Sequence, residues 1–243
     1  MVLRRTPLSS HLVRIVLGGL EGFVSTGIPD EWVGLVVPGQ FQSRYYTVRS
    51  WDGAELVLDV VVHEEGLVTQ WAQTECVGDT VGITEAKGSF ALPEDARWVA
   101  LVGDLTALPA VARIQESLVD FPGDVLAVIE SPDGPLEDYT AADWVAPPAP
   151  GESALAELVA RRDWPREPGY FWMAGESAQM REIRRHVRHT FGWDARHHDL
   201  MGYWSGTRAR RTRAVDPGPI YARGKAAGRS DEEIWAEYDE ARR

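Results

Sequence analysis

Cysteine is almost absent from this chain, since Cys76 is the only one among 243 residues. A single cysteine excludes a disulfide within the chain and a cysteine-based zinc or iron–sulfur cluster built from one copy. Histidines and carboxylates also lack the spacing of a metal site, and the crowded run His197-His198-Asp199 comes nearest to one. We therefore expect a partly buried Cys76 and no bound metal.

Long apolar runs and an excess of basic residues are missing as well. No run reaches the ~18 apolar residues that mark a membrane-spanning helix, and the first residues lack the order of a signal peptide. The net charge of −12 disfavours a general binder of nucleic acid or anionic membranes, because phosphate contacts need clustered Lys and Arg. We expect a cytoplasmic monomer without nucleic-acid partners or membrane insertion.

Two glycine motifs are also missing. The chain contains no Gly-x-Gly-x-x-Gly and no Walker loop. An ordinary dinucleotide-binding Rossmann site and a P-loop are therefore not supported.

The first part of the chain is rich in short strand-like runs. They lie at residues 10–17, 32–37, 44–49, 54–63 and 81–84, with turn residues such as Pro38-Gly39 and Asp52-Gly53 between them. Closely spaced strands of this kind predict a small antiparallel barrel, which we place at residues 1–94.

The pattern changes beyond Pro93 to alternating strands and helices. Strands are predicted at residues 98–102, 124–129, 170–174 and 201–206, helices at 108–118, 153–161 and 179–189, and a long proline-rich loop at 131–151. This alternation predicts an α/β domain with a parallel sheet at residues 95–206. Residues 207–243 follow as a basic segment and a closing helix that begins at the capping box Ser230 to Glu233.

Residues 44–49 read Arg-Tyr-Tyr-Thr-Val-Arg and form the most informative strand. Side chains alternate along a strand, so Arg44 and Tyr46 share one face while Thr47 and Arg49 share the other. Arg binds phosphate through two parallel hydrogen bonds, Tyr offers a flat ring for stacking, and Thr adds a hydroxyl. The alternative is an ordinary strand with a solvated Arg at each end.

Residues 66–72 predict a short helix that opens after Gly66. Free amides at a helix N-terminus bind phosphate, and His63 lies just before them. The alternative is a connector helix with Trp71 in the core, and spacing alone leaves both interpretations open.

Several motifs in fixed order resemble the ferredoxin reductase superfamily of flavoproteins. Within it, the chain is most similar to the siderophore-interacting proteins, which are FAD-dependent ferric-siderophore reductases. The similar motifs are residues 44–49 and 59–63, Trp71-Ala72, Gly78-Asp79, Gly88-Ser89, Gly103-Asp104, residues 106–110, Trp172, Ala174-Gly175-Glu176, Gly202-Tyr203-Trp204 and Gly206.

The resemblance implies a two-domain fold and bound FAD. Arg44 and His63 would contact the phosphates, residues 66–69 would cradle the diphosphate, Tyr46 would stack on the isoalloxazine ring, and Thr47 would contact its polar edge. The full implied set for FAD is Arg44, Tyr45, Tyr46, Thr47, Val48, Asp59, His63, Gly66, Val68, Thr69 and Trp71.

The resemblance also implies an electron donor and an acceptor. NADH, NADPH or reduced ferredoxin would supply electrons, with a nicotinamide near Asp104, Thr106 and Glu176, and a ferric siderophore would accept them near Lys87, Arg223 and Lys225. The flavin carries the redox chemistry, so no catalytic side chain is expected. Two alternatives are a flavin reductase of another acceptor and a non-catalytic siderophore-binding protein.

Three positions depart from the family pattern. Residues 66–69 keep the glycine and the hydroxyl of the usual Gly-Pro-Ala-Ser but lose its proline, and Glu85-Ala86-Lys87 replaces the common Gly-Pro-Arg. Leu105 stands where Glu is usual, near the expected nicotinamide opening.

Overall fold

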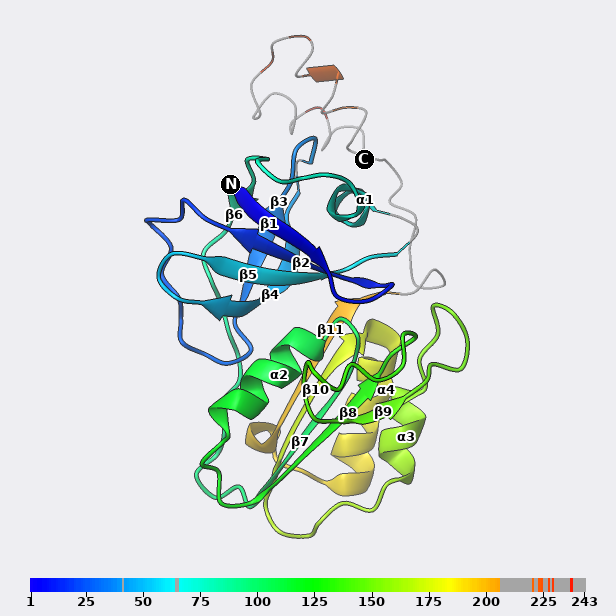
Figure 1. Cartoon of the computed structure of the whole chain (residues 1–243). Helices are drawn as coiled ribbons and strands as arrows, with labels where there is room; N and C mark the ends of the chain where they lie inside the picture. Colours follow the sequence, from blue (N-terminus) through cyan, green and yellow to red (C-terminus); the bar gives the residue numbers. More distant parts are fainter. Residues whose placement is uncertain are drawn as a thin grey trace. The chain divides into compact units, whose positions relative to one another are not determined.

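The computed structural model describes residues 1–40, 42–63 and 66–205, and the positions 220, 223, 224, 227, 229 and 237. The chain divides into two compact units, Met1–Gly206 and Thr207–Arg243. The first unit contains one antiparallel and one parallel sheet (Figure 1). Within the described ranges, no helix combines the length and hydrophobicity needed to cross a membrane.

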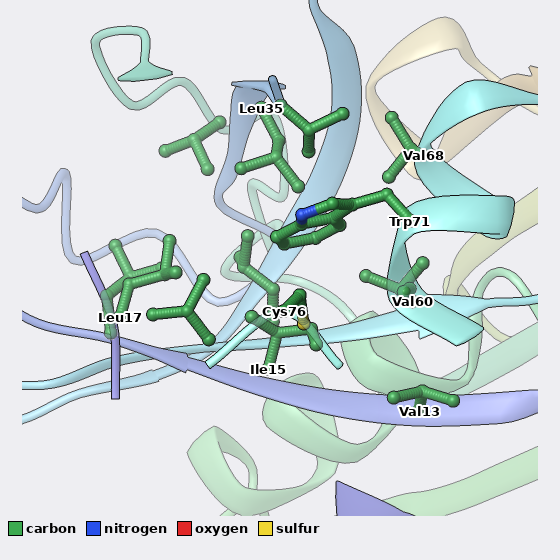
Figure 2. Packing of buried hydrophobic residues seen from close by; sticks show 14 of the residues in the cluster. Val13, Ile15, Leu17, Leu35, Val60, Val68, Trp71 and Cys76 are labelled. Carbon is green, nitrogen blue, oxygen red and sulfur yellow. The ribbon is translucent and has the colours of Figure 1, made fainter. Parts of the chain in front are cut away.

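The antiparallel sheet is curled into a half-barrel with the strand order β1-β2-β5-β4-β3-β6. Its strands are β1 (Val2–Pro7), β2 (Leu12–Leu17), β3 (Trp32–Val36), β4 (Arg44–Trp51), β5 (Leu56–Val61) and β6 (Gly82–Ile83). Helix α1 (Leu67–Gln73) packs its buried face, which includes Val68 and Trp71, against the core of this sheet (Figure 2).

Alternation along β5 shows why these residues form a half-buried strand. Leu58 and Val60 are fully buried in the half-barrel core. Asp59 faces away from that core, and Val61 packs against residues of the parallel sheet. The predicted period of 2 is therefore present, and both faces of the strand are used.

The parallel sheet has the strand order β11-β10-β7-β8-β9. Its strands are β7 (Trp98–Asp104), β8 (Asp124–Glu130), β9 (Asp143–Val145), β10 (Tyr170–Glu176) and β11 (His198–Trp204). Helix α2 (Leu108–Ser117) packs on one face and also contacts β4, while α3 (Leu155–Arg161) and α4 (Ser177–His186) cover the other face. The strand and helix alternation that the sequence predicts is confirmed.

Three elements differ from the sequence prediction. Strand β1 was not predicted because Arg4 and Arg5 interrupt its apolar pattern, and pairing with β2 forms it nonetheless. Strand β9 is a three-residue strand inside the stretch predicted as a loop. Helix α4 ends at His186 and continues as a π-helical turn, Val187–Phe191, instead of running to residue 189 as an α-helix.

Arg113 connects α2 to the half-barrel. Its guanidinium lies 3.3 Å from a carboxylate oxygen of Glu31 and donates to the carbonyl oxygen of Val48 at 2.6 Å. Glu31 is fully buried, and burial opposes its ionisation. Hydrogen bonds from Thr26 and Ser25, together with the charge of Arg113, nevertheless hold the pKa of Glu31 below its ordinary value.

Tyr139 provides a second connection. The Asp59 carboxylate accepts two hydrogen bonds from Arg14, each 2.8 Å long, and a third from the Tyr139 hydroxyl. The guanidinium carbons of Arg14 and Arg49 lie 5.7 and 5.3 Å from the centroid of the Tyr139 ring. The loop between β8 and β9 is thus held against the half-barrel by ionic, hydrogen-bonding and cation–π contacts.

We predict that Arg113→Met lowers the free energy of unfolding by about 2 kcal/mol, because Glu31 loses its cation but keeps its hydroxyl donors. Ionised Glu31 stabilises the fold at pH values above its unfolded pKa of 4.5, and this stabilisation is lost as the pH falls through its lower pKa in the folded state. Urea denaturation at neutral and acidic pH measures both effects. Arg181→Met, at an exposed position of α4, is the control, and equal losses in the two variants would contradict this account.

Candidate functional site

Strand β4 presents different residues on its two sides. Tyr46 and Val48 pack on the half-barrel core, and Thr47, which is 5% exposed, lies on the opposite side. Arg44 and Tyr45, at the start of the strand, are exposed. The strand therefore has the predicted alternation, with its exposed cation at one end.

Arg44 has no ion pair with an acid among the described residues, and its guanidinium makes one long hydrogen bond of 3.5 Å to the Ser43 carbonyl oxygen. Burial raises the pKa of Tyr46 to about 12, and the charge of Arg44 acts in the opposite direction. At neutral pH the site therefore presents an available guanidinium beside a neutral phenol.

Thr69 shapes the loop before α1. Its Oγ1 accepts a hydrogen bond from the backbone N–H of His63 at 2.7 Å and donates to the His63 carbonyl oxygen at 3.2 Å. Gly66, the N-cap of α1, has φ of 121°, which favours glycine. A Cβ there would lie 3.6 Å from the His63 ring, so the exposed imidazole lies beside the start of the helix.

The donors around α1 and Arg44 fit the diphosphate of FAD. The first turn of α1 contains no acidic residue, and no side chain caps it. Val68 of α1 belongs to the same core cluster as Leu35 (Figure 2), and Leu35 is the register partner of Arg44. Amide groups, an imidazole and a guanidinium are therefore carried by elements that share the half-barrel core, and these are the donors that phosphate requires.

Three other residues of the expected FAD set have structural contacts. Both backbone polar groups of Val48 are bonded, since its N–H donates to the Glu31 carbonyl oxygen at 2.8 Å and its own carbonyl accepts from Arg113. Asp59 holds Arg14 and Tyr139 as described above. Trp71 lies in the half-barrel core and donates its indole N–H to Asp79 at 2.8 Å, as the connector-helix interpretation required.

The structure brings Asp104, Thr106 and Glu176 together at the carboxyl edge of the parallel sheet. Asp104 ends β7, Glu176 ends the neighbouring β10, and Thr106 donates its backbone N–H to the Asp104 carboxylate at 2.9 Å. Trp204 of β11 donates its indole N–H to the same carboxylate at 2.6 Å. Glu176 caps α4 by accepting backbone N–H groups.

Leu105 is 4% exposed and packs in the core beside α2. The family-pattern departure at this position therefore adds an apolar side chain to the core. Gly103, two residues earlier, is required by packing, because a Cβ there would lie 2.4 Å from Ala107.

The candidate substrate residues are located separately. Lys87 is exposed and pairs through its backbone with Trp32, which is the register partner of Thr47. Arg223, in the second unit, forms a 2.7 Å ion pair with Glu237. Lys225 lies outside the described residues.

A cavity of about 570 Å³ lies at the amino edge of the parallel sheet, opposite to the carboxyl ends. Its lining residues are Ser89, Ala91, Pro93, Glu94, Asp95, Tyr170, Ala195, Arg196, His198 and Asp199. No cluster of His, Cys, Asp and Glu in the described ranges is arranged to hold a metal ion.

Sequence reasoning assigned no role to two residues that connect elements around the site. Arg113 reaches the carbonyl group of Val48, next to Thr47. Tyr203 lies on the half-barrel side of the parallel sheet and contacts Trp172. Tyr203 belongs to one of the motifs of the resemblance, but no local pattern marks the contacts of either residue, because their partners are distant in sequence.

The two sheets have the arrangement of the ferredoxin reductases. Ferredoxin-NADP+ reductase from Plasmodium falciparum superposes with a TM-score of 0.66 over 84% of this chain and 94% of that chain. The sequence identity is 12%, so this similarity concerns the fold alone. The predicted ferredoxin reductase-like fold, an antiparallel barrel-like part followed by an α/β part, is confirmed.

Sequence comparisons identify the family within that fold. Residues 40–90 match the siderophore-interacting FAD-binding domain, and residues 96–207 match the siderophore-interacting protein family. The NADPH-dependent ferric-chelate reductase of Escherichia coli is 28% identical over 76% of this chain and 84% of its own length. A siderophore utilization protein from T. fusca is 26% identical, with a TM-score of 0.72 over 88% of this chain and 93% of that one.

The chain belongs to the siderophore-interacting protein family. It is therefore an FAD-dependent oxidoreductase, as the resemblance in the sequence implies.

We predict a distinctive pH dependence from Asp104. Burial raises its pKa despite hydrogen bonds from Thr106 and Trp204. Asp104 therefore binds its proton more tightly in the folded protein than in the unfolded chain. It does not affect stability below the unfolded pKa of 3.8, and it lowers the free energy of unfolding increasingly as the pH rises toward the folded pKa. Asp104→Asn should raise the thermal unfolding temperature at neutral pH and flatten this dependence.

Asp133 provides a control of opposite sign. Burial opposes its ionisation, but hydrogen bonds from Ser9 and His11 hold its pKa below the ordinary value. Its stabilising contribution is therefore lost as the pH falls. Asp133→Asn should lower the unfolding temperature at neutral pH, and the same sign of change in both variants would refute the assignment.

Proposed function

We propose that the half-barrel, residues 1–94, binds FAD along β4 and that the α/β part, residues 95–206, receives NAD(P)H. Electrons would then pass through the flavin to Fe(III) held in a siderophore. The observation that carries this proposal is the exposed Arg44 guanidinium, which has no acidic partner among the described residues. Its register partner Leu35 shares the half-barrel core with Val68 of α1. Guanidinium, imidazole and backbone amide donors provide a place for a diphosphate in an otherwise acidic protein.

Arg44, His63 and the backbone of residues 66–69 would hold the diphosphate. Tyr46 would lie against the isoalloxazine ring, and the Thr47 hydroxyl would contact its polar edge. The remaining members of the set keep these groups in place. Tyr45 flanks Arg44. Val48 and Trp71 fix the strand and the helix in the core, and Asp59 holds the loop that carries Tyr139.

FAD accepts two electrons together and releases them one at a time, which suits transfer from a hydride donor to iron. Asp104, Thr106 and Glu176 would orient the nicotinamide at the carboxyl edge of the sheet. No side chain need act as an acid or base on the iron.

The acceptor class in this proposal is a ferric siderophore. Fe(II) binds oxygen-rich chelators weakly, so reduction in the cytoplasm would release the iron. Lys87 would make the opening locally positive for an anionic complex, since a net charge of −12 repels one. Arg223 and Lys225 are proposed to add to this charge.

The purified protein should be yellow, and its flavin should be bleached by a competent donor. Assays with NADH, NADPH and reduced ferredoxin as donors, each followed by a ferric siderophore, test the proposal. A flavin that no donor reduces, or that no ferric siderophore reoxidises, would leave a reductase of another acceptor or a non-catalytic siderophore binder.

We predict that Arg44→Ala lowers FAD affinity by about ten- to a hundredfold, because it removes a charge-assisted hydrogen bond. Titration of the apoprotein with FAD measures the change. Arg181→Ala removes an exposed arginine from α4 and serves as the control. Equal affinities for Arg44→Ala and the wild type would place the phosphates elsewhere.

We predict that Lys87→Ala raises KM for an anionic ferric siderophore and leaves a neutral ferric hydroxamate nearly unaffected. The difference should shrink as the salt concentration rises, because salt screens an exposed charge. Steady-state kinetics at low and high ionic strength measure it. Matching losses for both substrates would mean that Lys87 acts on structure and not through its charge.

A further inference from the structure

Trp32 begins β3 with its side chain directed away from the half-barrel core. Val33 and Leu35, the first and third residues after it, are fully buried in that core. Because side chains alternate along a strand, Trp32 lies on the opposite face of the sheet. The residue is half-buried, and none of the three core clusters in the described ranges includes it. Packing of these cores therefore does not explain an indole at this position.

Two cross-strand neighbours of Trp32 share its face of the sheet. Thr47 of β4 is its register partner. On the other side, Trp32 and Lys87 exchange both backbone hydrogen bonds, at 2.7 and 3.0 Å. Residues paired in this way direct their side chains to one face, with Cβ atoms about 5 Å apart. Thr47, Trp32 and Lys87 therefore form a continuous row across β4, β3 and the segment after β6.

This row runs from the interior of the protein to the solvent. Thr47 is 5% exposed, Trp32 is half-buried and Lys87 is exposed. The proposed function puts the polar edge of the flavin at the Thr47 end and the anionic acceptor at the Lys87 end. The indole lies between these two ends, where an acceptor drawn in by Lys87 would approach the flavin.

We propose that Trp32 contacts the ferric complex and determines its specificity by stacking on aromatic rings of the iron ligands. An indole offers a broad, flat apolar face, and pairs of rings gain free energy beyond the area that they bury. Lys87 attracts any anionic complex, whereas the indole favours complexes with aryl ligands over aliphatic complexes of the same sign of charge. This inference rests on the proposed function for the places of the flavin and the acceptor.

Ga(III) complexes test this contact without turnover, because flavins do not reduce Ga(III). The tris-catecholate complex has aryl ligands and the citrate complex has none, while both are anionic. In the FAD-loaded protein, Trp32→Leu should raise the Kd for the tris-catecholate about three- to tenfold and leave that for the citrate within about twofold, as measured by calorimetric titration. Trp32→Phe, which keeps a ring, should restore most of the affinity. Lys87→Ala is the matched control and should weaken binding of both complexes.

Steady-state kinetics with the corresponding Fe(III) complexes separate specificity from support of the flavin. Trp32→Leu should raise KM for the tris-catecholate, with kcat and FAD content at their wild-type values. Equal losses for the two complexes, a lower kcat with both, or no change with either would overturn the inference and leave the proposed function intact. A wild-type flavin that neither Fe(III) complex reoxidises would instead overturn both.

Discussion

The alternation of side chains along β4 is the constraint on which the rest of this structure depends. One side of the strand completes the half-barrel core through Tyr46 and Val48, and the other side carries the buried Thr47. A shift in register by one residue would exchange these two sets. The same strand therefore closes a core, contacts α2 and carries the candidate flavin site.

Arginine has two distinct uses in this acidic protein. Arg14, Arg49 and Arg113 are paired with Asp59, Glu116 and Glu31. The first pair joins β2 to β5, and the other two connect α2 to the half-barrel. Arg44 is exposed and has no acidic partner among the described residues. Because the paired cations are fixed by structural contacts, Arg44 is the arginine of β4 that is available to bind an anion.

Local patterns predicted much of this fold, and distant contacts account for what they missed. The alternation in residues 44–49 and 54–63 and the helical spacing of apolar residues in 108–118 are properties of neighbouring residues, so these strands and α2 were predictable. Strand β1 depends on pairing with β2 and has no clear pattern of its own. The Arg113 contact with Glu31 and the Tyr139 hydrogen bond to Asp59 join residues far apart in sequence, so only the fold reveals them.

The most direct test of this account is an anaerobic single-turnover experiment. The FAD-loaded protein is reduced with NAD(P)H, freed of excess donor and mixed with a ferric siderophore in the presence of an Fe(II) chelator. The account predicts that flavin absorbance returns while trapped Fe(II) accumulates in proportion to the electrons that the flavin held. A flavin that stays reduced, or that reoxidises without trapped Fe(II), would contradict it.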